Sequence, residues 1–171
     1  MTRMSHLAGQ TSWYLNRVVE FICGILMILL VLDIWLGIFN RYFYYLGLTW
    51  TEEIARYIMI WVALLAVSCG IARREHIGLL LVFNTLPAVV QRPLLALLDL
   101  ISFSFFVYLV YFGIGMVEAG FQTFARAFGM PMAYAHAAVP VSAAVAAVQV
   151  MLVAIRDQGQ LSFKPAAAEV E

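Results

Sequence analysis

Four apolar runs, each long enough to cross a lipid bilayer, dominate the sequence. Their approximate ranges are 18–39, 53–72, 94–117 and 132–155. A hydrocarbon core about 30 Å thick needs roughly 20 residues of α-helix, and each run meets that length. The pattern therefore predicts one all-α domain, residues 1–157, with four transmembrane helices. The polar, alanine-rich tail at 158–171 is expected to be disordered.

The overall composition agrees with a membrane protein. Of the 171 residues, 64% are apolar and only 12% are charged, whereas soluble domains carry about 25% charged residues. The formal net charge is zero and no basic recognition module is present, so we expect no nucleic-acid partner.

The distribution of basic residues predicts the orientation of the helices. Seven of them lie before the first run, between the second and third, or after the fourth: Arg3, Arg17, Arg73, Arg74, Arg92, Arg156 and Lys164. The opposite side has Arg41, Arg56 and Arg126. Because cytoplasmic loops carry the excess of Lys and Arg, both termini and the central loop are predicted to be cytoplasmic.

The central loop is long enough to hold further structure. Residues 76–86 read as a short helix that Pro87 should end, and we expect it to lie in the cytoplasmic membrane interface. A re-entrant segment is the alternative. Arg73, Arg74 and His76 at its start are expected to anchor the chain to anionic lipid headgroups.

The most distinctive polar residues lie at the start of the second run, at Trp50, Glu52, Glu53 and Arg56. Charges at the mouth of a membrane helix are costly unless they are paired or face protein. The i,i+4 and i,i+3 spacings place both glutamates on the same face as Arg56. Asp33 lies roughly 10 Å inside the first run. We expect it to pair with Arg56 and join the two helices, with an ion path or a contact to another protein as alternatives.

Few other residues suggest chemistry. Asp99 is expected to form an interfacial ion pair with Arg92 or with the Arg73–Arg74 loop. The sequence offers no catalytic residues, no metal ligands and no cofactor site, and Cys23 and Cys69 read as small apolar side chains. Two interpretations remain: a subunit of a larger membrane assembly, or a homo-oligomeric channel or small carrier that uses Asp33, Arg56 and Asp99.

A set of short motifs resembles a known family. These are Asn40-Arg41-Tyr42, the run from Trp50 to Arg56, Trp61, Gly70, and Arg73-Arg74-Glu75-His76-Ile77. In this order and spacing, in a four-span chain, they resemble the small membrane (Q) subunit of the tripartite ATP-independent periplasmic (TRAP) transporters. The resemblance covers roughly residues 17–100, and the fourth run fits by length and position.

The resemblance implies a function and partners. Such a subunit is a non-catalytic scaffold in the bacterial inner membrane, bound to a large multi-span subunit that carries the transport path. It serves the sodium-coupled uptake of an organic acid delivered by a periplasmic binding protein. Glu52, Glu53 and Arg56 match the family's acidic pair and arginine, so the resemblance gives them a structural and partner-facing role.

Overall fold

The computed structural model describes residues 3–43, 50–73, 88–125, 127 and 129–157. Five helices form in these residues: α1 (Arg3–Tyr42), α2 (Thr51–Arg73), α4 (Ala88–Gly120), α5 (Ala133–His136) and α6 (Ala138–Asp157). Four segments are long and apolar enough to cross a membrane: Ser5–Tyr42, Thr51–Arg73, Pro93–Gly120 and Ala133–Asp157. This confirms the four predicted apolar helices. The predicted helix at 76–86 and the tail at 158–171 lie outside the described residues, and the orientation of the termini stays a prediction.

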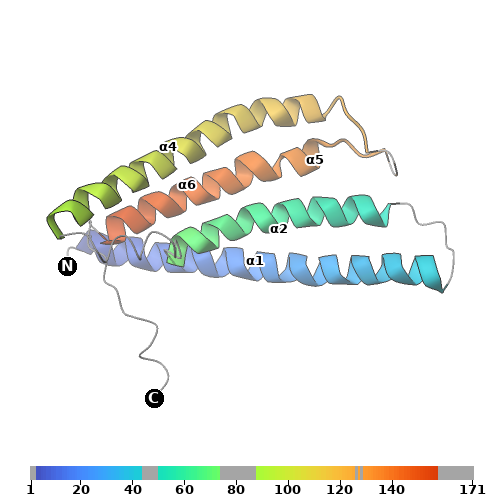
Figure 1. The fold of residues 1–171 in the computed structure, drawn as a ribbon, viewed down its shortest axis with the longest axis horizontal. Coiled ribbons are helices and arrows are strands. Elements are labelled where there is room, and N and C mark those ends of the chain that lie inside the picture. Colours follow the sequence, from blue (N-terminus) through green and yellow to red (C-terminus); the bar gives the residue numbers. More distant parts are fainter. Residues whose placement is uncertain (1–2, 44–49, 74–87, 126, 128, 158–171) are drawn as a thin grey trace, which may run out of the picture.

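The long helices lie side by side in an open array (Figure 1). Across the figure the order is α1, α2, α6 and α4. Helix α6 packs against α1, α2 and α4, whereas α4 contacts α6 and the short α5. α1 and α4 therefore occupy opposite edges of the array, and α6 is the helix that joins its parts.

Small side chains explain the central position of α6. In the most apolar 18-residue stretch of the fourth span 44% of the residues are buried, compared with none in that of α1 and 6% in that of α4. Ala143, Ala146 and Ala147 are among the buried residues. Small residues let helix backbones approach closely in lipid, where apolar surface alone does not drive association. The alanine-rich fourth run thus becomes the shared contact surface of the other helices.

Helix α1 begins much earlier than its apolar run. It has 40 residues, which at 1.5 Å per residue corresponds to about 60 Å, so the helix begins about four turns before the predicted span of residues 18–39. The polar N-terminal stretch stays helical because it has its own packing partner. Ala8, Ser12 and Val19 are all buried in this part of α1, and Ser12 is hydrogen-bonded to α6.

The fourth span is divided near its start into two helices, although the backbone of Ala137 between them keeps helical dihedral angles. The break falls at Ala137, between α5 and α6. Pro140 has no N–H to donate to the carbonyl of His136, and this weakens the first turn. Nearby, the carbonyl of Tyr134 in α5 accepts the indole N–H of Trp61 on α2, at 3.1 Å. This bond gives α2 a fixed contact with the start of the fourth span.

Candidate functional site

The mouth of α2 is the first polar cluster, and the local sequence explains its geometry. The Trp50 carbonyl accepts the N–H groups of Glu53 and Ile54, both at 3.1 Å, and so begins the helix. Glu52 and Glu53 lie in the first turn, where negative charge complements the helix dipole. Thr51 is only 5% exposed and packs against Gly37 of α1. A Cβ atom placed on Gly37 would lie 3.4 Å from the Oγ1 atom of Thr51.

Glu53 connects α2 to the segment between α4 and α5. Its Oε2 accepts the backbone N–H of Ala127 at 3.1 Å. In that segment Phe124 and Pro131 form an isolated antiparallel bridge, and Gly129 has a φ of +69°, a conformation that favours glycine. A hydrogen bond to an ionised acceptor is stronger than one to a neutral group. Glu53 therefore contributes to holding this outer segment against α2.

Arg56 pairs differently from the sequence-based expectation. Its guanidinium lies 4.0 Å from the Glu52 carboxylate, and the two side chains are 69% and 79% exposed. Exposed pairs of this kind contribute little to stability. The expected ion pair between Asp33 and Arg56 is not formed. Ala55 lines a hollow together with Asp33. Because successive side chains on a helix point about 100° apart, the Arg56 side chain is directed away from this hollow.

Asp33 lines an open hollow of about 870 Å³ between the ends of α1 and α2. Asn40, Arg41, Thr51 and Glu52 also line it. The Oδ2 atom of Asp33 is buried and has no hydrogen-bond partner among the described residues. Arg41, about two turns further along the same helix, is the basic residue that lines this hollow.

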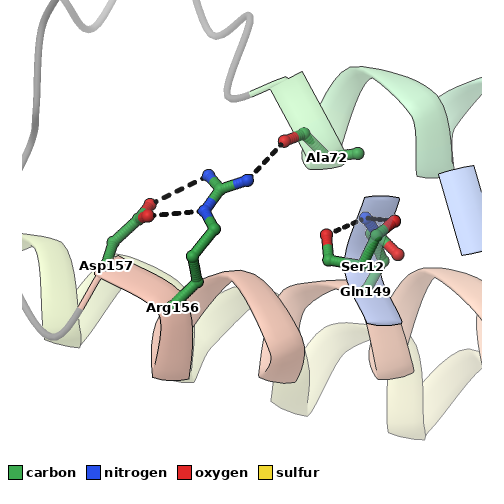
Figure 2. Close-up of polar contacts among 5 residues, drawn as sticks. All are labelled: Ser12, Ala72, Gln149, Arg156 and Asp157. Carbon is green, nitrogen blue, oxygen red and sulfur yellow. Dashed lines mark hydrogen bonds and ion pairs between the residues drawn. The ribbon is translucent and has the colours of Figure 1, made fainter. Parts of the chain in front are cut away.

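A second polar cluster lies at the other end of the array, where α1 begins and α2 and α6 end (Figure 2). Gln149 on α6 is completely buried and donates to the Ser12 hydroxyl at 2.7 Å and to the Ser12 carbonyl at 3.4 Å. Arg156 reaches from α6 toward α2, donating to the Ala72 carbonyl at 3.4 Å and to Asp157 at 2.6 Å. On the neighbouring helices Arg73 forms an ion pair with Glu20.

Of the residues predicted to anchor the chain to lipid, Arg73 lies in this second cluster, whereas Arg74 and His76 lie outside the described residues. Asp99 lines a hollow of about 290 Å³ between α2, α4 and α6. The sequence reasoning missed the Ser12–Gln149 contact. A signal was present, because a lone glutamine in an alanine-rich span needs a partner in lipid, and polar side chains commonly bond across membrane helices.

The polar groups in these two clusters hold neighbouring helices together. They bind backbone N–H groups, carbonyls and opposite charges on neighbouring helices. Within the ranges that the structure describes, no group of three or more His, Cys, Asp or Glu residues could hold a metal ion.

Comparison with known proteins shows the family. The model of the "Tripartite ATP-independent periplasmic transporters, DctQ component" matches residues 30–159, which is most of the chain. A Haemophilus influenzae protein assigned as a TRAP transporter small permease is 29% identical over 87 residues, 51% of this chain and 54% of that protein. The sialic acid TRAP transporter permease protein SiaT, from another strain of the species, is 26% identical over 101 residues, 59% of this chain.

The aligned regions span about half of the first relative and 16% of SiaT. Together with the four apolar helices, the family match confirms the resemblance inferred from the sequence motifs. The chain therefore belongs to the DctQ family, the membrane-embedded, non-catalytic small permease component of TRAP transporters.

Proposed function

We propose that this chain is the scaffold subunit of a sodium-coupled importer for an organic acid. In this proposal a large multi-span membrane subunit carries the transport path, and a periplasmic binding protein delivers the solute. The chain lies in the bacterial inner membrane with both termini in the cytoplasm, as the excess of basic residues on that side supports. Its contribution is to hold the immobile part of the transporter in place.

The open helix array is the observation that carries this proposal. The most apolar 18-residue stretch of α1 has no residue buried within the chain, and the helix exposes large side chains such as Phe21, Trp35 and Phe39. Lipid or another protein must cover such surface. A helix at the edge of the array that exposes so much apolar surface suits a scaffold subunit, which would enlarge the fixed part of a membrane complex by packing against a partner.

The relative SiaT supports a large partner and an acidic solute. The region of SiaT that aligns with this chain makes up 16% of that protein, so it is a small part of a larger permease protein. The name of SiaT gives sialic acid, an organic acid, as the transported compound. Both points are compatible with a role for this chain beside a larger membrane component.

The alternative, a channel or carrier formed by this chain alone, requires Asp33, Arg56 and Asp99 to share a path. Asp33 lines the hollow between α1 and α2 at one end, and Asp99 lines a different hollow beside α4 and α6. Arg56 points away from Asp33 and pairs with Glu52 at the surface. This separation favours the scaffold over the channel.

Replacement of Arg56 tests the proposed role of the α2 mouth in assembly. Arg56→Ala should lower co-purification with the large subunit about fivefold or more, the range expected when a contributing interface residue is truncated, and should lower solute uptake in parallel. Glu53→Ala should act in the same direction. Glu118→Ala, which removes an exposed carboxylate from α4, is the matched control and should assemble normally.

Normal assembly and uptake in both the Arg56 and Glu53 variants would remove the α2 mouth from the interface. Asp33→Asn should have a milder effect, because an amide can still form hydrogen bonds at that depth. Loss of uptake with intact assembly in the Asp33 variant would instead give Asp33 a direct role in transport.

A further inference from the structure

Three arginines from three helices meet where α1 begins and α2 and α6 end. Arg17, Arg73 and Arg156 line one hollow of about 430 Å³, together with Gly9, Ser12, Trp13, Asn16, Glu20 and Ala72. We propose that this hollow, which we name the basic pocket, binds the phosphate headgroup of an anionic phospholipid. Basic pockets between membrane helices are suited to such headgroups.

The charges around the basic pocket do not balance internally. Arg73 pairs with Glu20, and Arg156 pairs with Asp157. Arg17 is exposed and has no hydrogen bond or ion pair with any residue that the structure describes. Among the described residues at the pocket, the three guanidinium groups therefore exceed the two carboxylates by one positive charge. A phospholipid phosphodiester carries one negative charge and would restore the balance.

Donors remain available to bind the phosphate oxygens. A guanidinium has five N–H groups, and Arg156 directs its donors toward Asp157 and the Ala72 carbonyl, as Figure 2 shows. All five N–H groups of Arg17 are without a hydrogen-bond partner among the described residues. Because guanidinium groups bind phosphate through paired N–H donors, Arg17 is the residue that we expect to dominate headgroup binding.

An apolar hollow continues from the basic pocket along α1. It measures about 400 Å³, shares Arg17 and Glu20 with the basic pocket, and is otherwise lined by Phe21, Gly24, Ile25 and Ile28. From residue 17 to residue 28 the helix rises about 17 Å. No atom lies within 4 Å of the position where a Cβ on Gly24 would be, so this part of the surface is open. The combination of a charged pocket and an apolar hollow fits a lipid with an acyl chain better than a free phosphate ion.

The basic pocket also lies at the level where a headgroup is expected. The apolar segments of α2 and α6 end beside it, at Arg73 and Asp157. Trp13 lines the pocket and is 59% exposed, and tryptophan is enriched at membrane–water interfaces. A phosphate bound here would contact α1, α2 and α6 together and should stabilise their association.

Native mass spectrometry of the purified full chain tests the headgroup assignment. The chain is mixed with equal amounts of dioleoylphosphatidylglycerol and dioleoylphosphatidylcholine, and the ratio of the two lipid adducts is measured. The wild type should favour phosphatidylglycerol, and Arg17→Gln should lower this preference about fivefold, the effect expected from one arginine near a membrane surface. Arg17→Lys should retain most of it. Arg41→Gln, which removes an exposed arginine at the other end of α1, is the matched control.

An unchanged preference in Arg17→Gln, or an equal loss in Arg41→Gln, would overturn the proposal. Because Arg17 is exposed and has no partner in the described chain, the variant should keep the helix content and the melting temperature of the wild type.

A second variant distinguishes a lipid from a free phosphate ion. Gly24→Leu would fill the apolar hollow while leaving all three arginines in place, and should lower phosphatidylglycerol adducts severalfold. Gly70→Leu is the control, because a Cβ on Gly70 also has no atom within 4 Å but lies on α2, away from the hollow. Retained adducts in Gly24→Leu would show that the apolar hollow does not hold an acyl chain, and displacement of the adducts by millimolar inorganic phosphate would show that the pocket binds a free anion; either result would overturn the lipid assignment.

Discussion

Gln149 is the most completely buried polar side chain in the described structure, and it connects the two ends of the sequence. A polar group inside a membrane domain is costly unless it is hydrogen-bonded. The amide N–H groups of Gln149 meet this requirement through bonds to the hydroxyl and carbonyl of Ser12, whereas its Oε1 atom is buried without a hydrogen-bond partner among the described residues. The pair explains why the first part of α1 stays helical and lies against α6, although this stretch is too polar to be predicted as part of a span.

A double-mutant cycle measures the contribution of this pair. Ser12→Ala and Gln149→Leu should each lower the free energy of unfolding, with a coupling energy of about 0.6 kcal/mol and no more than about 1.7 kcal/mol, the range known for hydrogen bonds between membrane helices. Unfolding would be followed by circular dichroism as sodium dodecyl sulfate is added to mixed micelles. Thr11→Ala is the control, because Thr11 bonds within its own helix to the Leu7 carbonyl. A coupling as large for Thr11 as for Ser12 would contradict the assigned contact.

The two neighbouring glutamates at the α2 mouth should behave differently. Glu53 binds the Ala127 N–H, whereas Glu52 is exposed and faces Arg56. Glu53→Ala should speed hydrogen exchange of the Ala127 amide about fivefold, which corresponds to about 1 kcal/mol for a partly exposed hydrogen bond to a charged group. Glu52→Ala should leave it unchanged. Equal exchange in the two variants would show that the contact with Ala127 does not persist in solution.

At the scale of the helices, glycine positions decide how closely α4 approaches the fourth span. A Cβ on Gly120 would lie 2.7 Å from the Nδ1 atom of His136 and 2.8 Å from the Cα atom of Ala133. A Cβ on Gly113 would lie 3.0 Å from the ring of Pro140. Because the neighbours of Gly120 include backbone atoms, they cannot rotate away. The packing of α4 on α5 therefore depends on this glycine.

Two alanine substitutions in α4 should have effects of opposite sign. Gly120→Ala should destabilise the protein by about 1–3 kcal/mol, as overpacking does. Gly115→Ala should be neutral or stabilising by up to about 1 kcal/mol, because a Cβ there meets open space and alanine is the better helix former. Unfolding in mixed micelles compares the two variants. Equal effects would mean that α4 does not approach α5 as closely as the structure shows.

The two cysteines test the pairing of α1 with α2. The Cys23 and Cys69 thiols are free and lie within hydrogen-bonding reach of each other. A short bifunctional thiol reagent such as dibromobimane should therefore join them and become fluorescent in the wild-type chain. Cys23→Ser and Cys69→Ser should each abolish the signal. Labelling of both thiols without cross-linking would contradict the register of these helices.

The sequence was sufficient for the number and approximate position of the long helices, because the apolar runs are long and separated by polar residues. It was insufficient where a tertiary contact overrides local polarity. The early start of α1 depends on Ser12 and Gln149, which are 137 positions apart. Arg56 lies at a position from which its long side chain was expected to reach Asp33, but that side chain pairs with Glu52 instead. The order of the helices follows from small residues in the fourth run, whose partners the pattern alone does not identify.

At the scale of the whole molecule, the open array explains why this chain suits a supporting role. Helix α6 holds α1, α2 and α4 together, while the two edges leave much apolar surface exposed. The polar contacts lie mainly near the two ends of the helices, so the described chain forms a mostly apolar wall. Such a wall offers a large area to lipid or protein and provides few groups that could bind a dissolved solute.

Reconstitution into lipid vesicles tests this central claim most directly. The chain alone, the large subunit alone and the two together would be incorporated into separate vesicles with a sodium gradient, and uptake of the organic acid would be followed after addition of the loaded binding protein. If this chain is a scaffold, uptake should occur only in vesicles that contain both membrane subunits. Solute or ion flux through vesicles that contain this chain alone would contradict the scaffold role.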